Sequence, residues 1–206
     1  MLKITNFKTI FLMIFFYQNV NSLEKNNDIL IRCIGQNFQC KAYFYNKIFD
    51  VNIGTNGLTS SENKKEGDLQ TPIGYFALEN IVFYKKERIK SKFKAIKIKK
   101  HYKWCDDSQS EIYNQFFILS KKTKKLCNSY EDLLRDDDIY DYIIPIKYNT
   151  NPVIAGRGSA IFIHIKKDSP TAGCAAFQKN DLEFIIRNLD TRSKIQIEII
   201  CKLPID

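Results

Sequence analysis

Two residues whose chemistry could be coupled, His164 and Cys174, stand ten positions apart in the sequence. A thiol becomes a strong nucleophile when it loses its proton, and an imidazole is the side chain that most often removes one. Ala160–Ile165 is an apolar run of strand character, which places His164 near the end of a buried strand. Ser169-Pro170-Thr171 predicts a turn, and Gly173 allows an unusual backbone angle directly before the thiol. This order predicts a Cys–His nucleophile site.

The same two residues also have a purely structural interpretation. A buried cysteine is more often a small apolar side chain than a nucleophile, and a lone histidine is more often a hydrogen-bonded polar residue than a base. The residue types alone therefore leave catalysis and core packing open.

The segments around these residues resemble a known family of cysteine enzymes. His164, a variable loop and then Thr171-Ala172-Gly173-Cys174 follow the signature of the YkuD-type L,D-transpeptidase catalytic domain, whose members cross-link peptidoglycan. With Pro170, the second half is similar to a branch of the family that has Pro-Thr-x-Gly-Cys. The resemblance covers about Cys40 to Phe177. Its other segments are Lys65–Phe76 (similar to the family's EGD…TP.G.F), Trp104-Cys105-Asp106-Asp107, Tyr113-Asn114 and Leu134–Asp141.

The resemblance implies a thioester mechanism without a cofactor or metal ion. Cys174 would attack the carbonyl of an L-residue in a peptidoglycan stem peptide, with His164 as the base. Backbone N–H groups at Gly173 and Cys174 would stabilise the oxyanion, and the carbonyl of Ile165 would orient the imidazole. The imidazole and these N–H groups are expected to stabilise the thiolate. The family is acylated by carbapenems, and the same reaction is expected at Cys174.

Two positions depart from the commoner family pattern. A glycine usually follows the histidine, and an arginine usually stands two places after the cysteine; here these positions are Ile165 and Ala176. Arg157, between two glycines and close in sequence to the strand of His164, is the candidate to bind a substrate carboxylate in place of the missing arginine. A structural salt bridge with the charged cluster at 135–141 is the alternative for Arg157.

Four more residues are predicted to bind substrate. Ser159 and Thr171 belong to the two halves of the signature. Trp104 and Asp106 belong to a segment that, by resemblance, shapes the substrate cleft, where a carboxylate could receive the ammonium group of a diaminopimelate side chain. Asp106 could equally cap a turn.

The expected fold is mainly β, of the α+β class: a curled or sandwiched mixed sheet with two short helices. One helix is predicted at Ser129–Leu134, with Asn128 or Ser129 as its cap. The other carries apolar residues at i, i+3, i+4 and i+7, and Asn180 with Glu183 resembles a capping box. Its apolar residues are Leu182, Ile185, Ile186 and Leu189. Alternating Ile195, Ile197 and Ile199 predict a final strand.

Residues 1–22 are predicted to be a secretory signal peptide, leaving residues 23–206 as the catalytic domain. Lys3 and Lys8 precede an apolar core, Ile10–Tyr17, that is too short to span a bilayer. An uncleaved anchor or a buried first helix is the alternative. Cleavage would leave a periplasmic protein without a stable membrane anchor, in a compartment that permits disulfides. A two-residue turn at 36–37 would place Cys33 opposite Cys40.

The chain carries a formal charge of +9. Its lysines are scattered, with no basic helix and no aromatic–basic RNA motif, so nucleic acid is not an expected partner. Stem peptides of the carboxylate-rich wall polymer fit better. The expected activity is that of an L,D-transpeptidase. An L,D-carboxypeptidase or related wall hydrolase using the same site, or a non-catalytic wall-binding domain, is the alternative. The sequence leaves the oligomeric state open.

Overall fold

The computed structural model describes residues 27–35 and 38–200. The predicted signal peptide and Cys201 lie outside the described residues. The elements in chain order are β1 (Ile29–Ile34), β2 (Gln39–Phe44), β3 (Lys47–Asn52), β4 (Leu58–Ser60), β5 (Thr71–Ala77), β6 (Ile81–Tyr84), β7 (Lys94–Lys97), β8 (Tyr102–Cys105), β9 (Phe116–Ile118), η1 (Lys124–Leu126), β10 (Tyr130–Asp132), η2 (Asp138–Tyr140), β11 (Tyr142–Pro145), β12 (Phe162–Ile165), β13 (Ala175–Phe177), α2 (Lys179–Asn188) and β14 (Lys194–Ile200).

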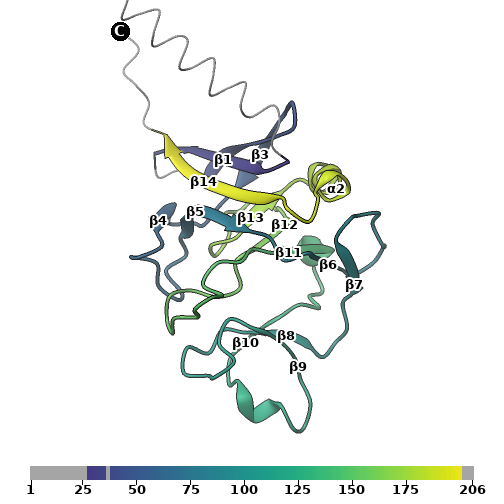
Figure 1. Ribbon diagram of the computed structural model, residues 1–206. Helices are drawn as coiled ribbons and strands as arrows, with labels where there is room; N and C mark the ends of the chain where they lie inside the picture. The colour runs from purple at the N-terminus through teal and green to yellow at the C-terminus, as the bar shows by residue number, and fades with distance from the viewer. Residues whose placement is uncertain (1–26, 36–37, 201–206) are drawn as a thin grey trace, which may run out of the picture.

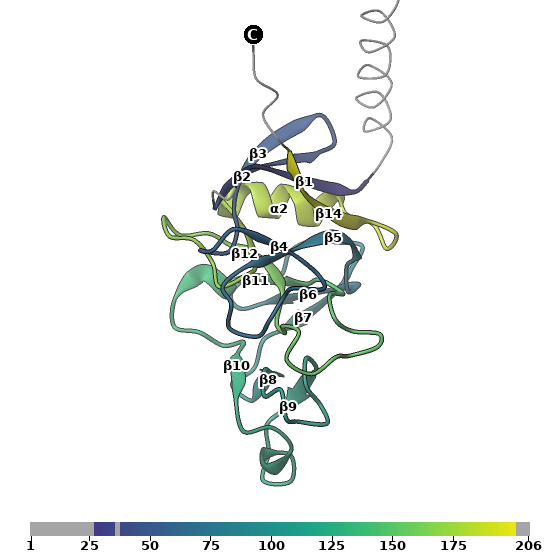
Figure 2. The ribbon, with the colours of Figure 1, turned by 90° about the vertical axis from the view of Figure 1, so that its left-hand side faces the viewer.

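The strands form one large mixed sheet and one small sheet. The large sheet has the order β4-β5-β14-β1-β2-β3-β13-β12-β11-β6-β7, and the small antiparallel sheet has the order β10-β8-β9. The small sheet lies at the end of the molecule remote from β1 and β14 (Figures 1 and 2). The expected mainly β fold with a mixed sheet is therefore confirmed.

Alternating side chains build the main core on one face of the large sheet. Ile29, Ile31 and Cys33 of β1 point inward, as do Ile195 and Ile197 of β14. Helix α2 buries its apolar stripe in the same cluster, as the spacing of these residues predicts. Figure 2 shows α2 lying along the sheet.

Two local predictions about helices are wrong. Ser129–Leu134 contains strand β10 rather than a helix. This segment pairs with β8, where Glu131 lies opposite Trp104, and the pairing overrides the local capping signal. The described residues therefore contain one α-helix rather than two. Helix α2 has Gln178 as its N-cap without a side-chain cap, so the predicted capping box does not form, and Glu183 pairs with Arg187 instead.

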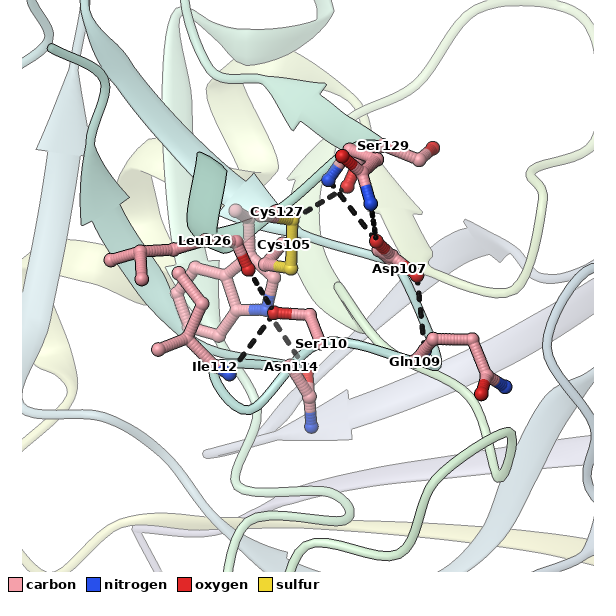
Figure 3. The surroundings of a disulfide bond; sticks show 11 residues. Cys105, Asp107, Gln109, Ser110, Ile112, Asn114, Leu126, Cys127 and Ser129 are labelled. Carbon is pink, nitrogen blue, oxygen red and sulfur yellow. Dashed lines mark hydrogen bonds between the residues drawn. A yellow bond between two sulfur atoms is a disulfide. The ribbon is translucent and has the colours of Figure 1, made fainter. Parts of the chain in front are cut away.

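Two disulfides hold the described chain. Cys33 and Cys40 are joined across the first hairpin, as their predicted opposition allows. Cys105 and Cys127 are joined within the small sheet and its adjoining loop (Figure 3). Cys174 is free and buried. Within the described residues, no helix has the length and apolar character needed to cross a membrane.

Candidate active site

Parallel pairing of β12 with β13 brings the two residues of the predicted nucleophile site together. Ile163 pairs with Ala175 and His164 with Ala176, so Cys174 lies beside Phe162 at the start of β13. Phe162 and His164 point to the same face, because side chains alternate along a strand. Cys174 is 8% exposed and His164 is 7% exposed. Both side chains therefore sit at a buried position on one face of the sheet.

The Cys174 thiol is protonated in this arrangement. Burial raises its pKa to about 12, although the N–H of Phe162 and the charge of Lys64 act in the opposite direction. Sγ donates to the carbonyl of Ala160 at 3.3 Å and accepts from the Phe162 N–H at 3.3 Å. Burial therefore opposes the thiolate that the sequence predicts, because desolvation outweighs the favourable contacts.

The imidazole of His164 is held as a neutral base. Nδ1 lies 2.8 Å from the carbonyl oxygen of Ile165, as the sequence predicts, and a carbonyl can only accept. Nδ1 therefore carries the proton and Nε2 is left with a free lone pair. Burial lowers the pKa of His164 to about 4. The ring of Tyr140 packs edge-on against the imidazole, with centroids 5.4 Å apart, and fixes its plane.

The turn before the thiol requires glycine. Gly173 has φ of +137°, and a Cβ there would lie 2.9 Å from the carbonyl oxygen of Gln70. Thr171 Oγ1 accepts from the Gly173 N–H at 3.0 Å and donates to the Cys174 carbonyl at 2.8 Å. Thr171 thus builds the turn, and the Gly173 N–H is already in use. The Cys174 N–H has no hydrogen-bond partner within residues 27–35 and 38–200.

Comparison with family models identifies the family of this chain. Residues 41–197 match the YkuD family, described as the L,D-transpeptidase catalytic domain. The chain belongs to the YkuD family. No match was found among curated proteins or among solved structures. The matched range contains both residues of the predicted nucleophile site, His164 and Cys174.

Trp104 joins the small sheet of the YkuD domain to the surroundings of Cys174. Its indole packs edge-on against Phe162, with centroids 5.1 Å apart, in the apolar cluster that contains Cys174. Its Nε1 donates to Asn114 Oδ1 at 2.9 Å, which also accepts from the Ala160 N–H at 3.1 Å. Asn114 Nδ2 donates to the carbonyls of Tyr148 and Asn149. Asn114 is therefore the central hydrogen-bonding residue of this wall.

Two predicted binding residues have buried polar atoms without partners. Ser159 is 7% exposed, and its Oγ makes no hydrogen bond within the described chain. Asp106 Oδ1 is likewise buried and unpartnered. The carboxylate that caps the turn is that of Asp107, which accepts from the N–H groups of Gln109 and Asn128 (Figure 3). The alternative role of Asp106 as a turn cap is therefore wrong.

The cation that acts on the imidazole of His164 is Arg135, not Arg157. Arg135 forms two hydrogen bonds with Asp137, lies 3.5 Å from Glu131 and stacks over the ring of Tyr140 at 5.3 Å. Burial is the main cause of the low pKa of His164, and the charge of Arg135 lowers it further. Arg157 makes no ion pair within the described residues, so its alternative role in a salt bridge is wrong.

Sequence reasoning missed two residues whose charges act on the Cys174 thiol, Glu131 and Lys64. Glu131 was placed in a predicted helix, where its side chain had no reason to face the thiol. Lys64 precedes the EGD segment and carries no local signal of burial. Both come from segments far in sequence from Cys174, so only the fold brings them to it.

Proposed function

We propose that the chain is an exported L,D-transpeptidase that forms a thioester between Cys174 and a peptidoglycan stem peptide. The observation that supports this most strongly is the tautomer of His164. Its Nδ1–H is committed to the Ile165 carbonyl, which leaves Nε2 as the acceptor for a proton. Within a YkuD domain, a neutral base beside a protonated thiol is the starting state for general-base catalysis.

Acylation begins when the thiol leaves the Ala160 carbonyl and turns toward the imidazole. Nε2 of His164 takes the thiol proton while sulfur attacks the carbonyl carbon of the L-residue. The tetrahedral intermediate collapses, the bond to the D-amino acid breaks, and His164 passes the proton to the leaving amine. An existing peptide bond thus supplies the acyl group, and no ATP is needed.

The Cys174 N–H is the proposed oxyanion donor. It is unpartnered within the described chain, whereas the Gly173 N–H is donated to Thr171 Oγ1. A preorganised donor of this kind stabilises the charge that develops on the carbonyl oxygen. In the second half of the reaction, His164 removes a proton from an acceptor amine, which attacks the thioester and regenerates the thiol.

Two carboxylates are proposed to bind the substrate's ammonium group. Glu131 lies opposite Trp104 in the small sheet, so both side chains point to the face that packs toward Cys174. Asp106 follows Trp104 by two residues. Burial raises the pKa of Glu131, and the charge of Asp106 contributes to the increase. A substrate ammonium would relieve this repulsion and would also give Asp106 Oδ1 the partner it lacks.

Arg135 is proposed to bind the substrate carboxylate in place of the missing arginine. It lies 3.5 Å from Glu131, so a carboxylate and an ammonium of one diaminopimelate end could be bound side by side. Arg157 is the other candidate. Its charge lowers the pKa of Tyr148, which burial raises overall, and its guanidinium has no ion pair within the described residues.

A wall hydrolase using the same site is the second candidate function. Ala176 is 1% exposed and occupies the position of the family's usual arginine. If the family's arginine helps to bind the acceptor amine, a chain without this arginine would bind the amine poorly. Water would then attack the thioester, and the product would be a trimmed stem peptide.

Export of the chain is proposed on two grounds. The YkuD family acts on the cell wall, and the two disulfides of the described chain are of a kind that persists in oxidising compartments. Residues 1–22 are the proposed signal peptide, and the periplasm is the proposed location.

Incubation of the mature protein with purified muropeptides tests the proposal, with Cys174→Ser as the control. Mass spectrometry should detect cross-linked dimers that form with the wild-type protein and not with the variant. Trimmed monomers would assign the hydrolase. Unchanged muropeptides would contradict both activities and favour a wall-binding domain.

A further inference from the structure

The loop between β4 and β5 carries a buried ammonium group. Lys64 is 2% exposed, and lysine is seldom buried unless it is paired. Its Nζ donates to Asp68 Oδ1 at 2.6 Å and to the carbonyl of Lys65 at 2.9 Å. Asp68 also accepts from the backbone N–H groups of Lys65 and Gln70. Burial raises the pKa of Asp68, but these hydrogen bonds outweigh it and lower the pKa overall. The buried ammonium of Lys64 and the partly buried carboxylate of Asp68 therefore form an ion pair.

This ion pair packs against the backbone that leads to the thiol. A Cβ at Gly158 would lie 3.2 Å from both Cε and Nζ of Lys64, and Gly158 has φ of +95°. Two residues later, the carbonyl of Ala160 accepts the thiol's hydrogen bond. The side chain of Lys64 thus packs against Gly158, two residues before Ala160.

The same loop also contacts the turn that presents the thiol. The carbonyl oxygen of Gln70 lies 2.9 Å from the position of a Cβ at Gly173. Asp68 Oδ1 accepts from the N–H of Gln70 at 2.9 Å, and this hydrogen bond holds Gln70 in place. The Glu66 N–H donates to the carbonyl of Gly156 at 2.9 Å. One loop therefore contacts both backbone segments that flank Cys174.

Charged and titratable groups face the thiol from four elements. They are Lys64 in the β4–β5 loop, Glu131 on β10, Tyr140 in η2 and His164 on β12. His164 is neutral, and Tyr140 has a pKa raised well above its ordinary value, mainly by burial. Glu131 opposes a negative charge on sulfur and Lys64 favours one. Lys64 is thus the cation that acts on the thiol among the described residues.

We propose that Lys64, held by Asp68, is a positioning residue that fixes the Gly158–Ala160 backbone against Cys174 and favours the negative charge that develops on sulfur. The ammonium itself is too buried to touch a substrate. The inference takes from the proposed function only that Cys174 is the nucleophile.

Alkylation of Cys174 by iodoacetamide tests this directly, because it reports the thiolate without requiring any muropeptide reaction. The oxidised protein is alkylated at several pH values between pH 7 and pH 10 and is then digested. Peptide mass spectrometry gives the rate of alkylation at Cys174 alone. Lys64→Met keeps the length of the side chain and removes its charge. It should slow the alkylation about tenfold at each pH, the effect of a rise of one unit in the thiol pKa. Lys64→Arg should restore most of the rate.

Lys103→Met is the matched control. Lys103 is also a buried lysine paired with an aspartate, Asp132, and its charge is not among those that act on the Cys174 thiol. This variant should alkylate at the wild-type rate. Equal rates for Lys64→Met and the wild type, or equal losses in the Lys64 and Lys103 variants, would overturn the proposal.

A second variant covers the case in which Lys64→Met does not fold. That substitution leaves Asp68 as a partly buried carboxylate without its cation, which is destabilising. Lys64→Met combined with Asp68→Asn removes both charges and keeps an acceptor for the Gln70 N–H. It should fold and still alkylate about tenfold more slowly than the wild type. A wild-type rate in the double variant would overturn the proposal, whatever the outcome with muropeptides.

Discussion

Replacing Asn114 with leucine should strongly destabilise the protein. Asn114 is 4% exposed, and its amide makes four hydrogen bonds: from Trp104 Nε1, from the Ala160 N–H, and to the carbonyls of Tyr148 and Asn149. Leucine has a similar volume, so the substitution removes these bonds without opening a large cavity. It also adds backbone strain, because Asn114 has φ of +56°, which leucine seldom adopts.

The expected cost follows from counting the groups that lose their partner. A hydrogen bond between neutral groups contributes roughly 1 kcal/mol, and an unsatisfied buried group costs at least as much. Four such bonds give about 4 kcal/mol in the free energy of unfolding, a large part of the roughly 5–15 kcal/mol that stabilises a domain. Asn114 also holds the N–H of Ala160, whose carbonyl accepts the hydrogen bond of the Cys174 thiol. Loss of Asn114 should therefore shift the thiol and slow its acylation.

Urea denaturation of the oxidised protein measures this cost, with Asn188→Leu as the control. Asn188 is partly buried and its side chain makes one hydrogen bond, to the carbonyl of Phe184, so its replacement should cost about 1 kcal/mol or less. If Asn114→Leu were no less stable than Asn188→Leu, the network would not connect the small sheet to the nucleophile as described.

The remaining predictions concern pH, binding and processing. Because the pKa of His164 is lowered to about 4 from an ordinary value near 6.5, the unfolded state binds more protons between these values. The stability that depends on neutral His164 is complete above about pH 6.5 and is lost as the pH falls toward 4, by roughly 3 kcal/mol. Denaturation of His164→Gln should show a correspondingly smaller loss of stability over this range, and an equal loss would contradict the burial of the imidazole. Thiolate absorbance near 240 nm should be absent at neutral pH, since the pKa of Cys174 is about 12, and a full thiolate signal would refute the neutral pair. Arg135→Ala should raise KM for the muropeptide about tenfold with a smaller effect on kcat, and a larger effect of Arg157→Ala would assign the carboxylate to Arg157. N-terminal sequencing of periplasmic protein should begin near Leu23, and an intact Met1 in a membrane fraction would contradict cleavage.

Regular hydrophobic patterns predicted much of the fold. The alternation of Ile195, Ile197 and Ile199 identified strand β14, and the helical spacing of Leu182, Ile185 and Ile186 identified α2. These patterns succeed because each records which face of an element is buried. The turn at Gly173 was predictable for a similar reason, since the conformation before the thiol excludes a side chain.

Features that depend on distant pairing were not predictable. Strand β10 has a helix-like local sequence, and only its pairing with β8 makes it extended. Strand β13 is three residues long, too short for a periodic signal. The raised pKa of Cys174 also depends on the fold, because desolvation by surrounding elements outweighs the contacts that the local sequence suggests. Lys64 and Glu131 reach the thiol from loops and strands that no local pattern connects to it.

Acylation by a carbapenem is the most direct test of Cys174 as a nucleophile activated by His164. Intact-protein and peptide mass spectrometry of the oxidised protein should find one adduct per chain, on Cys174. Cys174→Ser should abolish the adduct, and His164→Ala should slow its formation by roughly 100-fold or more, the usual contribution of a positioned base. An adduct on another residue, or equal labelling of the His164 variant, would contradict the account and leave Cys174 as a residue of the core.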